Sequence, residues 1–451
     1  MEPKNHRFGG GATETFLHPL VVVWMLVAIA LIFTLPRKKV VTPFLISFFL
    51  IPDAQVVVLG GAHLTMHQIL ILAVLIRMAT FRETPLTVRF GGGFDTLDKL
   101  VVLWTLTSLI VFCIQFTEVQ AWIRGVATLL EELGGYLAAR FLVPDREAVN
   151  RTVRALAVIC AIQGVCMLNE QFTHQNVFSF AGANWPTVRN GHVRSEGAMG
   201  NLWGGAFAGA CVPLFLWLWT EREFKIVAFV GITGATAMVF ATYASTSWMA
   251  FFAGVGALGF WPLRKQMRLI RWGIITILIG LHLVMNGPVW SLLEKIDLTG
   301  GSSSYHRYML VDNCIRHFGD WWLFGYKYYG QWGFDMWDLC NQFVAVAVTG
   351  GLISLILFIM IYSRGFGKIG RARTRMSGNR KQEWLLWCLG STLFVHVVAS
   401  FGINYMVQLV MALFVVLACI QASTFSNQQA TVRETHSTNK SVPRWRELSS
   451  V

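Results

Sequence analysis

Residues 341–362 read NQFVAVAVTGGLISLILFIMIY, a stretch without a single charged side chain. About 20 apolar residues in an α-helix cross the hydrocarbon core of a bilayer, so this stretch predicts a membrane-spanning helix. Basic residues follow it directly: Arg364, Lys368, Arg371, Arg373, Arg375, Arg380 and Lys381. Lys and Arg beside a span are retained in the cytoplasm, so the sequence also predicts which end of this helix is cytoplasmic.

The same pattern recurs along the chain. The apolar runs are 19–35, 40–52, 62–76, 100–116, 119–142, 153–169, 198–219, 224–242, 246–262, 270–287, 341–362, 384–400 and 403–422. The run 40–52 is short, so it is either a complete span or a re-entrant segment. Basic loops alternate with less basic ones throughout, which places the N-terminus outside the cytoplasm. We therefore expect an all-α polytopic transmembrane bundle of about 12–13 helices.

Composition agrees with a membrane protein. The 451 residues are 55% hydrophobic and only 14% charged, and the mean hydropathy is +0.53. The formal net charge of +13 comes from clusters between apolar runs, which indicates topology rather than nucleic-acid binding. Nucleotide-binding glycine motifs, HExxH and CxxC are absent from the sequence, so we expect no metal and no cofactor.

The predicted topology gives a single transmembrane domain, 1–422, followed by a polar cytoplasmic tail, 423–451, that we expect to be disordered. Only two extracytoplasmic loops have any size, at about 170–197 and 288–340. Any chemistry is therefore expected in these two loops. Within the second loop, the stretch 305–318 is typical of an amphipathic helix, with apolar contacts from Tyr305, Tyr308, Met309, Val311 and Ile315.

These outer loops keep cations on the side where cations are disfavoured. They are Arg189, Arg194, Arg307, Arg316 and Lys327. One interpretation is contact with lipid headgroups or ordinary solvation. The other is that several of them bind the diphosphate of an anionic lipid-linked substrate, because guanidinium groups bond phosphate oxygens in pairs.

Two histidines accompany these cations. His306 and His317 are each a candidate general base or an interfacial hydrogen-bonding group, since imidazole titrates near neutral pH. Asp338 is expected either to cap the following helix or to orient a histidine. Cys314 and Cys340 share the same loop, so a disulfide between them is an open alternative to two free thiols.

Charged residues also occur inside the run 119–142. They are Arg124, Glu131, Glu132 and Arg140. Charges at membrane depth are costly and need partners. Arg124 and Glu131 are seven residues apart and share one helix face, so they are expected to pair within the bundle, the alternative being a role facing the substrate.

Three blocks of sequence resemble the O-antigen ligase and O-antigen polymerase-like membrane glycosyltransferases of bacteria. The first block is His192-Val193-Arg194-Ser195-Glu196-Gly197, and the second is Ala244-Ser245-Thr246-Ser247. The third runs from His306-Arg307 through Asp320-Trp321-Trp322-Leu323-Phe324-Gly325 to Asn341-Gln342 and Gly350-Gly351-Leu352. Together they span about residues 190–360.

The resemblance implies transfer or polymerisation of a glycan, from undecaprenyl diphosphate to an acceptor hydroxyl, at the outer face of the bacterial inner membrane. The reaction would need no metal. His306 or His317 would be the base, and Arg194 and Arg307 would stabilise the leaving diphosphate with Arg189, Arg316 and Lys327. Glu196, Asp338 and Asn341 would support them. The partners would be the lipid-linked glycan, an acceptor glycan or lipid, and membrane lipids.

One position departs from the ligase pattern. Ligases of this family carry a His before Asn, whereas Cys340 precedes Asn341 here. A neutral thiol is a poor base, which favours a polymerase or a ligase with a relocated His. A transporter or flippase of a lipid-linked or small solute is the alternative from another class, although the two halves of the chain show no similarity. A noncatalytic scaffold would leave the outer Arg and His residues without a role.

Overall fold

The chain folds almost entirely into helices in a computed structural model, which describes residues 15–59, 62–81, 90–296, 298 and 304–440, with side chains up to Phe425. The α-helices are α1 Pro19–Thr34, α2 Arg37–Leu50, α3 Met66–Thr80, α5 Thr96–Gln115, α6 Val119–Leu129, α7 Gly135–Leu142, α8 Arg146–Thr173, α9 Asn201–Trp219, α10 Lys225–Ala241, α11 Ser245–Gly259, α12 Met267–Val284, α13 Ser304–Arg316, α14 Phe318–Trp321, α15 Gln342–Arg375, α16 Arg380–Ser400 and α17 Val407–Lys440. Parts of the expected N-terminus, basic loop, long outer loop and tail lie outside the described residues, at 1–14, 82–89, 297, 299–303 and 441–451.

Sheet structure in the described residues consists of two short antiparallel ribbons and one isolated bridge between Phe16 and Val56. One pairs β1 Val56–Leu59 with β2 Ala62–Thr65, and the other pairs β3 Thr187–Arg189 with β4 His192–Arg194. Both connect helices and neither forms a core. The fold is therefore all-α, as predicted.

Eight helices in the described part of the chain are long and apolar enough to cross a membrane. They are Thr96–Gln115, Arg146–Thr173, Asn201–Trp219, Arg222–Ala241, Trp261–Val284, Gln342–Arg375, Arg380–Ser400 and Val407–Phe425. The helices α1 and α3 are apolar but have only 16 and 15 residues. Each of the thirteen predicted runs contains helix, so the polytopic bundle is confirmed, but eight rather than thirteen reach crossing length. The run 40–52 forms α2, a 14-residue helix with Pro43 inside it.

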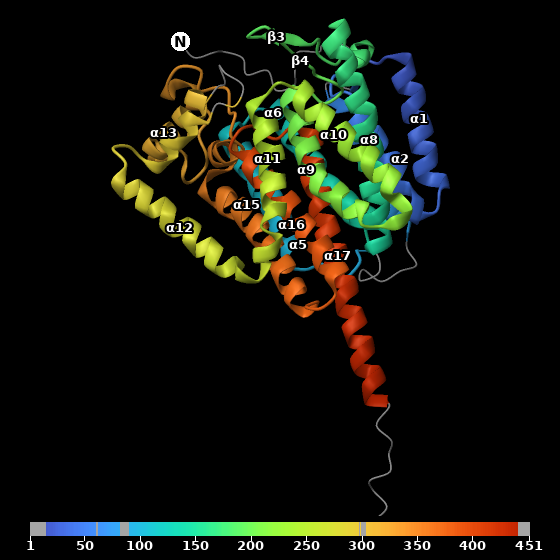
Figure 1. Cartoon of the computed structure of the whole chain (residues 1–451). Coiled ribbons are helices and arrows are strands. Elements are labelled where there is room, and N and C mark those ends of the chain that lie inside the picture. Colours follow the sequence, from blue (N-terminus) through green and yellow to red (C-terminus); the bar gives the residue numbers. More distant parts are fainter. Residues whose placement is uncertain (1–14, 60–61, 82–89, 297, 299–303, 441–451) are drawn as a thin grey trace, which may run out of the picture.

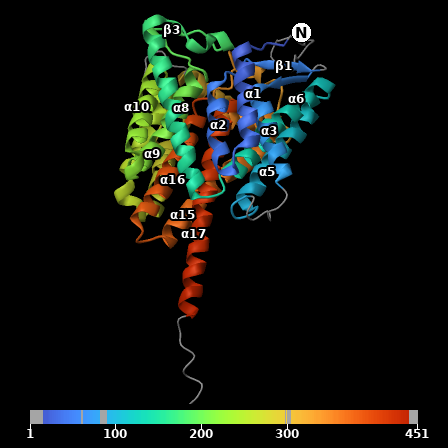
Figure 2. The same cartoon turned by 90° about the vertical axis from the view of Figure 1, so that its right-hand side faces the viewer.

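The two ends of the bundle differ. Figure 1 shows the ribbon β3–β4 and helix α13 at one end, and α17 leaving the bundle at the opposite end. The view in Figure 2 also places β3 and α17 at opposite ends. We refer to these as the α13 end and the α17 end. The tail was expected to begin at 423, whereas α17 continues to Lys440.

Loops that the charge pattern assigns to the cytoplasmic side contact one another. Three ion pairs join them: Lys38 with Glu147 at 4.0 Å, Arg146 with Glu221 at 3.9 Å, and Arg264 with Glu383 at 3.2 Å. Each pair links two loops expected in the cytoplasm. The alternation of basic loops therefore agrees with the way the helices are stacked.

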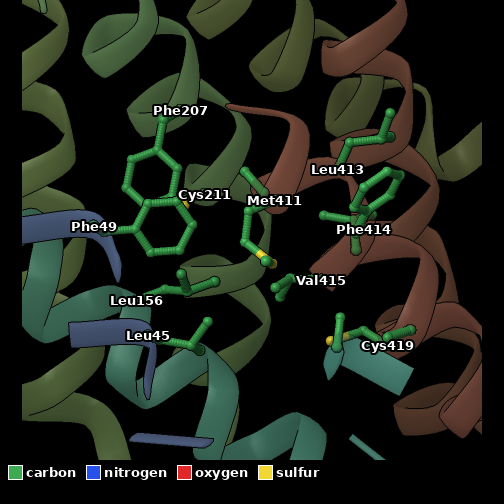
Figure 3. Packing of buried hydrophobic residues seen from close by; sticks show 14 of the residues in the cluster. Leu45, Phe49, Leu156, Phe207, Cys211, Met411, Leu413, Phe414, Val415 and Cys419 are labelled. Atoms are coloured by element: carbon green, nitrogen blue, oxygen red, sulfur yellow. The ribbon is translucent and has the colours of Figure 1, made fainter. Parts of the chain in front are cut away.

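The core lies where α2, α8, α9 and α17 meet. Figure 3 shows Phe49 of α2 against Phe207 of α9, with Leu156 of α8 and Met411 of α17 beside them. The rings of Phe49 and Phe207 lie 4.7 Å apart between centroids. Because lipid tails are as apolar as these side chains, close packing rather than exclusion of water holds such a core together.

Helices α8 and α10 approach each other most closely at glycines. A Cβ placed on Gly234 would lie 2.5 Å from the carbonyl oxygen of Cys160, and one on Gly164 would lie 2.6 Å from the carbonyl oxygen of Gly234. These contacts are with backbone, which cannot move aside as a side chain can. The crossing therefore requires glycine at both positions.

The charges in the run 119–142 find partners other than the expected ones. A π-helical turn, Leu130–Gly134, separates α6 from α7 and carries Glu131, which accepts a hydrogen bond from Gln68 Nε2 at 2.7 Å. Arg140 pairs with Asp98 of α5 at 2.8 Å, and both are buried. Arg124 interacts electrostatically with Glu131, but the predicted direct ion pair between them does not occur among the described residues. The partners come from other helices, which a single-helix pattern does not reveal.

Two further expectations for the long outer loop need correction. The amphipathic helix is present as α13, but its buried face contains Arg307, Leu310 and Cys314, whereas Tyr305 and Ile315 are exposed. The predicted apolar contacts were therefore wrong for Tyr305 and Ile315, whereas Val311 does pack against the cluster around Cys314 and Trp321. Cys314 and Cys340 are free thiols, so the disulfide alternative is excluded.

The crossing of α8 and α10 can be tested with matched glycine substitutions. Gly234→Ala should destabilise the protein by about 1–3 kcal/mol, because the added methyl group meets backbone. Gly256→Ala in α11 is the control, since a Cβ there meets nothing within 4 Å and Ala favours a helix. Thermal unfolding of both variants in detergent measures the difference; equal stability would contradict this packing.

Candidate functional site

A cavity of about 260 Å³ opens at the α13 end between segments distant in sequence. Residues from the β3–β4 ribbon, the start of α11, α13 and the α16–α17 loop line it. Its charged lining residues are Arg189, Arg194, Arg307 and Asp338. Three cations face one carboxylate, so the cavity suits an anion.

The β3–β4 ribbon places two of these cations. Thr187 pairs with Arg194 and Arg189 with His192 across the ribbon. The turn between the strands consists of Asn190 and Gly191, both with positive φ, at 51° and 76°. Asn-Gly is the preferred sequence for such a tight hairpin turn, so this signal could have predicted the ribbon.

The side chain of Arg194 is partly buried. Burial lowers the pKa of its guanidinium, and the neighbouring charge of Arg189 lowers it further. Its Nε atom is buried and has no hydrogen-bond partner among the described residues. A buried donor without an acceptor is costly, so an anion in the cavity would satisfy it.

Arg307 reaches the cavity from the buried face of α13. Its Nε donates to the carbonyl oxygen of Gly402 at 3.3 Å, and its Nη2 donates to Oγ1 of Thr246 at 3.0 Å. Only 8% of Arg307 is exposed. Helices α11 and α13 and the α16–α17 loop thus fix the orientation of this guanidinium.

His306 lies beside Arg307 and is oriented by backbone. Its Nε2 is 2.8 Å from the carbonyl oxygen of Asp338. Because a carbonyl oxygen only accepts, Nε2 carries the proton, and the neutral ring keeps its lone pair on Nδ1. Asp338 was expected either to cap α15 or to orient a histidine. It does not cap α15, but its main-chain carbonyl oxygen orients His306.

The side chains of His306, Asp338 and Cys340 also come together. One ligand atom from each lies within 4.8 Å of the others. Burial raises the pKa of the Cys340 thiol to about 12, so this thiol stays protonated at neutral pH. These three residue types are able to bind zinc. A metal-dependent mechanism is therefore the alternative to a metal-independent one at this site.

Two expected supporting residues shape the borders of the site. Glu196 is buried and accepts hydrogen bonds from the backbone N and Nδ2 of Asn201 at 3.0 and 2.8 Å, at the start of α9. Burial raises the pKa of Glu196. Asn341 caps α15, since its Oδ1 accepts from Phe343 N at 3.0 Å and Val344 N at 3.2 Å. Both are structural supports next to lining residues.

His306, Glu196 and Asn341 are neighbours of lining residues but do not themselves line the cavity. Three further predicted site residues are not brought to it at all. Arg316 pairs with Asp312 at 2.6 Å. His317 contacts Asp320 at 3.1 Å and stacks on the ring of Trp332, and Lys327 lies over the ring of Tyr328. Their place on the same loop as Arg307 was not enough to predict a shared site, because Arg316 is on the exposed side of α13 and His317 and Lys327 lie beyond its end.

The cavity also contains residues that the sequence did not single out. Tyr243 and the Gly402–Asn404 loop line it, and Trp203 Nε1 donates to the carbonyl oxygen of Asn404 at 2.8 Å. Tyr243 has a positive φ of 43° and stacks on His192 at 3.9 Å between centroids. A bulky residue with positive φ is unusual, but this is visible only in the structure.

The third block ends at Gly350-Gly351-Leu352, and the local backbone explains why residue 351 is a glycine. Gly351 interrupts α15 with a φ of 72°, and a Cβ there would lie 2.7 Å from the carbonyl oxygen of Leu323. The stretch after α14 packs on this break, with Leu352 N donating to the carbonyl oxygen of Trp322 at 2.8 Å. This glycine therefore anchors the outer loop to the bundle.

The three blocks of the resemblance therefore meet at the α13 end. His192–Gly197 supplies Arg194, Ala244–Ser247 supplies lining residues and the partner of Arg307, and the third block supplies Arg307 itself. Comparison of the whole chain with protein-family models and with curated proteins finds no match.

Proposed function

We propose that this chain transfers or polymerises a glycan from undecaprenyl diphosphate onto an acceptor hydroxyl at the outer face of the bacterial inner membrane. The observation that carries the proposal is the shared cavity of Arg194 and Arg307. These residues come from loops more than 100 positions apart in the sequence. Arginines are costly to bury, so two of them around one cavity favour an anionic ligand.

The leaving group explains the need for both arginines. When the anomeric carbon–oxygen bond to the diphosphate breaks, the bonding electrons go to phosphate oxygen and negative charge increases there. Guanidinium groups already fixed in position stabilise this charge more in the transition state than in the ground state. Arg307 is fixed by Gly402 and Thr246, and Arg194 carries the donor that lacks a partner.

His306 is the proposed base. The acceptor hydroxyl attacks the anomeric carbon and its proton passes to Nδ1 of His306, while Nε2–H remains bonded to the Asp338 carbonyl oxygen. Cys340 cannot take this role because its thiol stays protonated. This supports a polymerase, or a ligase whose base has moved from the position of Cys340 to His306.

Removing either cavity arginine should abolish transfer. Arg194→Ala and Arg307→Ala should each lower the rate about 100- to 1,000-fold, as for loss of an oxyanion donor. The matched control is Arg316→Ala, which removes a cation from the same helix as Arg307 but outside the cavity. Purified variants in liposomes would be assayed for lengthening or transfer of lipid-linked glycan. Full activity in both cavity variants would refute the mechanism, and solute movement without transfer would indicate a transporter.

The two histidines should behave differently. His306→Ala should lower kcat about 100- to 10,000-fold, the usual contribution of a general base. His317→Ala should leave kcat within about twofold, because His317 stacks on Trp332 away from the cavity. Steady-state kinetics on both variants measures this. The assignment fails if His317→Ala is the inactive one.

The remaining alternative is that His306, Asp338 and Cys340 bind a catalytic metal, and metal removal tests it. Transfer by the proposed route should be unchanged after EDTA treatment, because the arginines supply the positive charge. Loss of activity that zinc restores would show that this group binds a catalytic metal instead. Cys340→Ser provides the control, since it removes the thiol ligand but leaves His306 in place.

A further inference from the structure

A second cavity, of about 300 Å³, lies at the α17 end. It is remote from the cavity at the α13 end, for which we propose glycan transfer and which we call the glycan cavity. The loop 91–93, the start of α5, the last turns of the α15 helix and residues 421–425 of α17 line it. Its charged lining residues are Asp95, Arg140, Arg364, Lys368, Arg371 and Arg375. Five cations and one carboxylate therefore surround one space.

Four of the cations lie on one face of α15. Arg364, Lys368, Arg371 and Arg375 are separated by four, three and four residues, which is the spacing of a helix face. Retention in the cytoplasm explains basic residues near this end of α15, but it needs neither a common face nor a cavity. The arrangement is therefore more specific than topology requires.

Most of this charge is not neutralised within the protein. Lys368 pairs with Asp95, and Gln421 Nε2 donates to Asp95 at 2.9 Å. Arg364, Arg371 and Arg375 make no ion pair or side-chain hydrogen bond with the described residues. Their guanidinium groups remain as donors around the cavity.

Arg140 provides an independent indication of a ligand. It is only 1% exposed, its Nε donates to Asp98 at 2.8 Å, and its Nη2 donates to the carbonyl oxygen of Gly93 at 3.2 Å. Its Nη1 is buried and has no hydrogen-bond partner among the described residues. Because a buried unsatisfied donor on a charged group is costly, a bound anion would stabilise this arrangement.

The opposite wall is a glycine loop packed against the protein. Gly91 and Gly92 have positive φ, at 46° and 110°. A Cβ on Gly91 would lie 2.0 Å from the carbonyl oxygen of Pro144, and one on Gly92 would lie 2.6 Å from the ring of Phe425. Only glycine permits this close approach, so the wall is a defined part of the fold.

We propose that this cavity binds a phosphate-bearing anion at the end of the bundle that the charge pattern assigns to the cytoplasm. Several guanidinium groups around one space suit phosphate, whose oxygens accept paired hydrogen bonds. The phosphate belongs either to the headgroup of an anionic phospholipid or to a soluble phosphate compound. This site is separate from the glycan cavity and does not depend on the proposed transferase activity.

The test measures binding by the full chain in nanodiscs. The chain carries Arg194→Ala, so that the glycan cavity does not bind the probe. Inorganic pyrophosphate is titrated in phosphatidylcholine nanodiscs while thermal unfolding is followed, and retained phosphatidylglycerol is measured by native mass spectrometry. Saturable stabilisation by pyrophosphate indicates a soluble ligand, whereas retention of phosphatidylglycerol alone indicates a lipid headgroup.

Matched variants distinguish a defined anion-binding site from general attraction by the basic residues at this end of the bundle. The double change Arg364→Ala with Arg371→Ala should weaken binding about thirtyfold, since each cation near a phosphate contributes about fivefold. The control, Arg380→Ala with Lys381→Ala, removes two exposed cations of the same end outside the cavity and should have little effect. The single change Arg371→Ala, expected to weaken binding about fivefold, replaces the double variant if that variant does not fold. Equal losses in both doubles, or no binding of either probe, would overturn the proposal.

Discussion

The guanidinium group of Arg307 is the constraint around which the α13 end is organised. A charged group that is 92% buried requires hydrogen-bond acceptors from its surroundings, and it obtains them from Thr246 on α11 and from Gly402 between α16 and α17. Those contacts join α13 to two parts of the bundle that lie far from it in sequence. The cavity is bordered by Arg307 and Gly402 from this arrangement, while the β3–β4 ribbon adds Arg194 and the Asp338 carbonyl oxygen orients His306 beside it.

The two ends of the bundle use arginine in a similar way. At each end an arginine that lines the cavity has a nitrogen buried without a partner among the described residues, Nε of Arg194 at one end and Nη1 of Arg140 at the other. In both places further cations line the same space. A membrane protein gains nothing in stability from such groups alone, which favours anionic ligands over a purely structural role.

Much of the architecture could be predicted from the sequence, because apolar length and the positions of Lys and Arg report directly on membrane insertion. Each of the thirteen runs contains helix, and the ribbon β3–β4 and helix α13 of the two outer loops lie at one end. The lengths were less predictable: the run 119–142 is interrupted by a π-helical turn at Glu131, and α2 ends after 14 residues. Such breaks depend on packing between helices rather than on composition.

The candidate site was predicted in part. Arg189, Arg194 and Arg307 were identified because cations are unusual in outer loops, and His306 because an imidazole is a suitable general base. Arg316, His317 and Lys327 were selected on the same two grounds but lie away from the cavity, since the sequence did not show that Arg316 is on the exposed side of α13 or that the other two lie beyond the end of this helix. Asp98, the partner of Arg140, and Gly402, an acceptor for Arg307, could not be predicted because each belongs to a different helix or loop.

The central claim is that Arg194 and Arg307 together bind one diphosphate. A cryo-electron microscopy structure of the full chain with an undecaprenyl-diphosphate-linked glycan tests this most directly. The account predicts that the diphosphate lies in the α13-end cavity, within hydrogen-bond distance of both guanidinium groups, with His306 facing the carbon side of the bond to be broken. A diphosphate bound elsewhere, or one that contacts neither arginine, would contradict it.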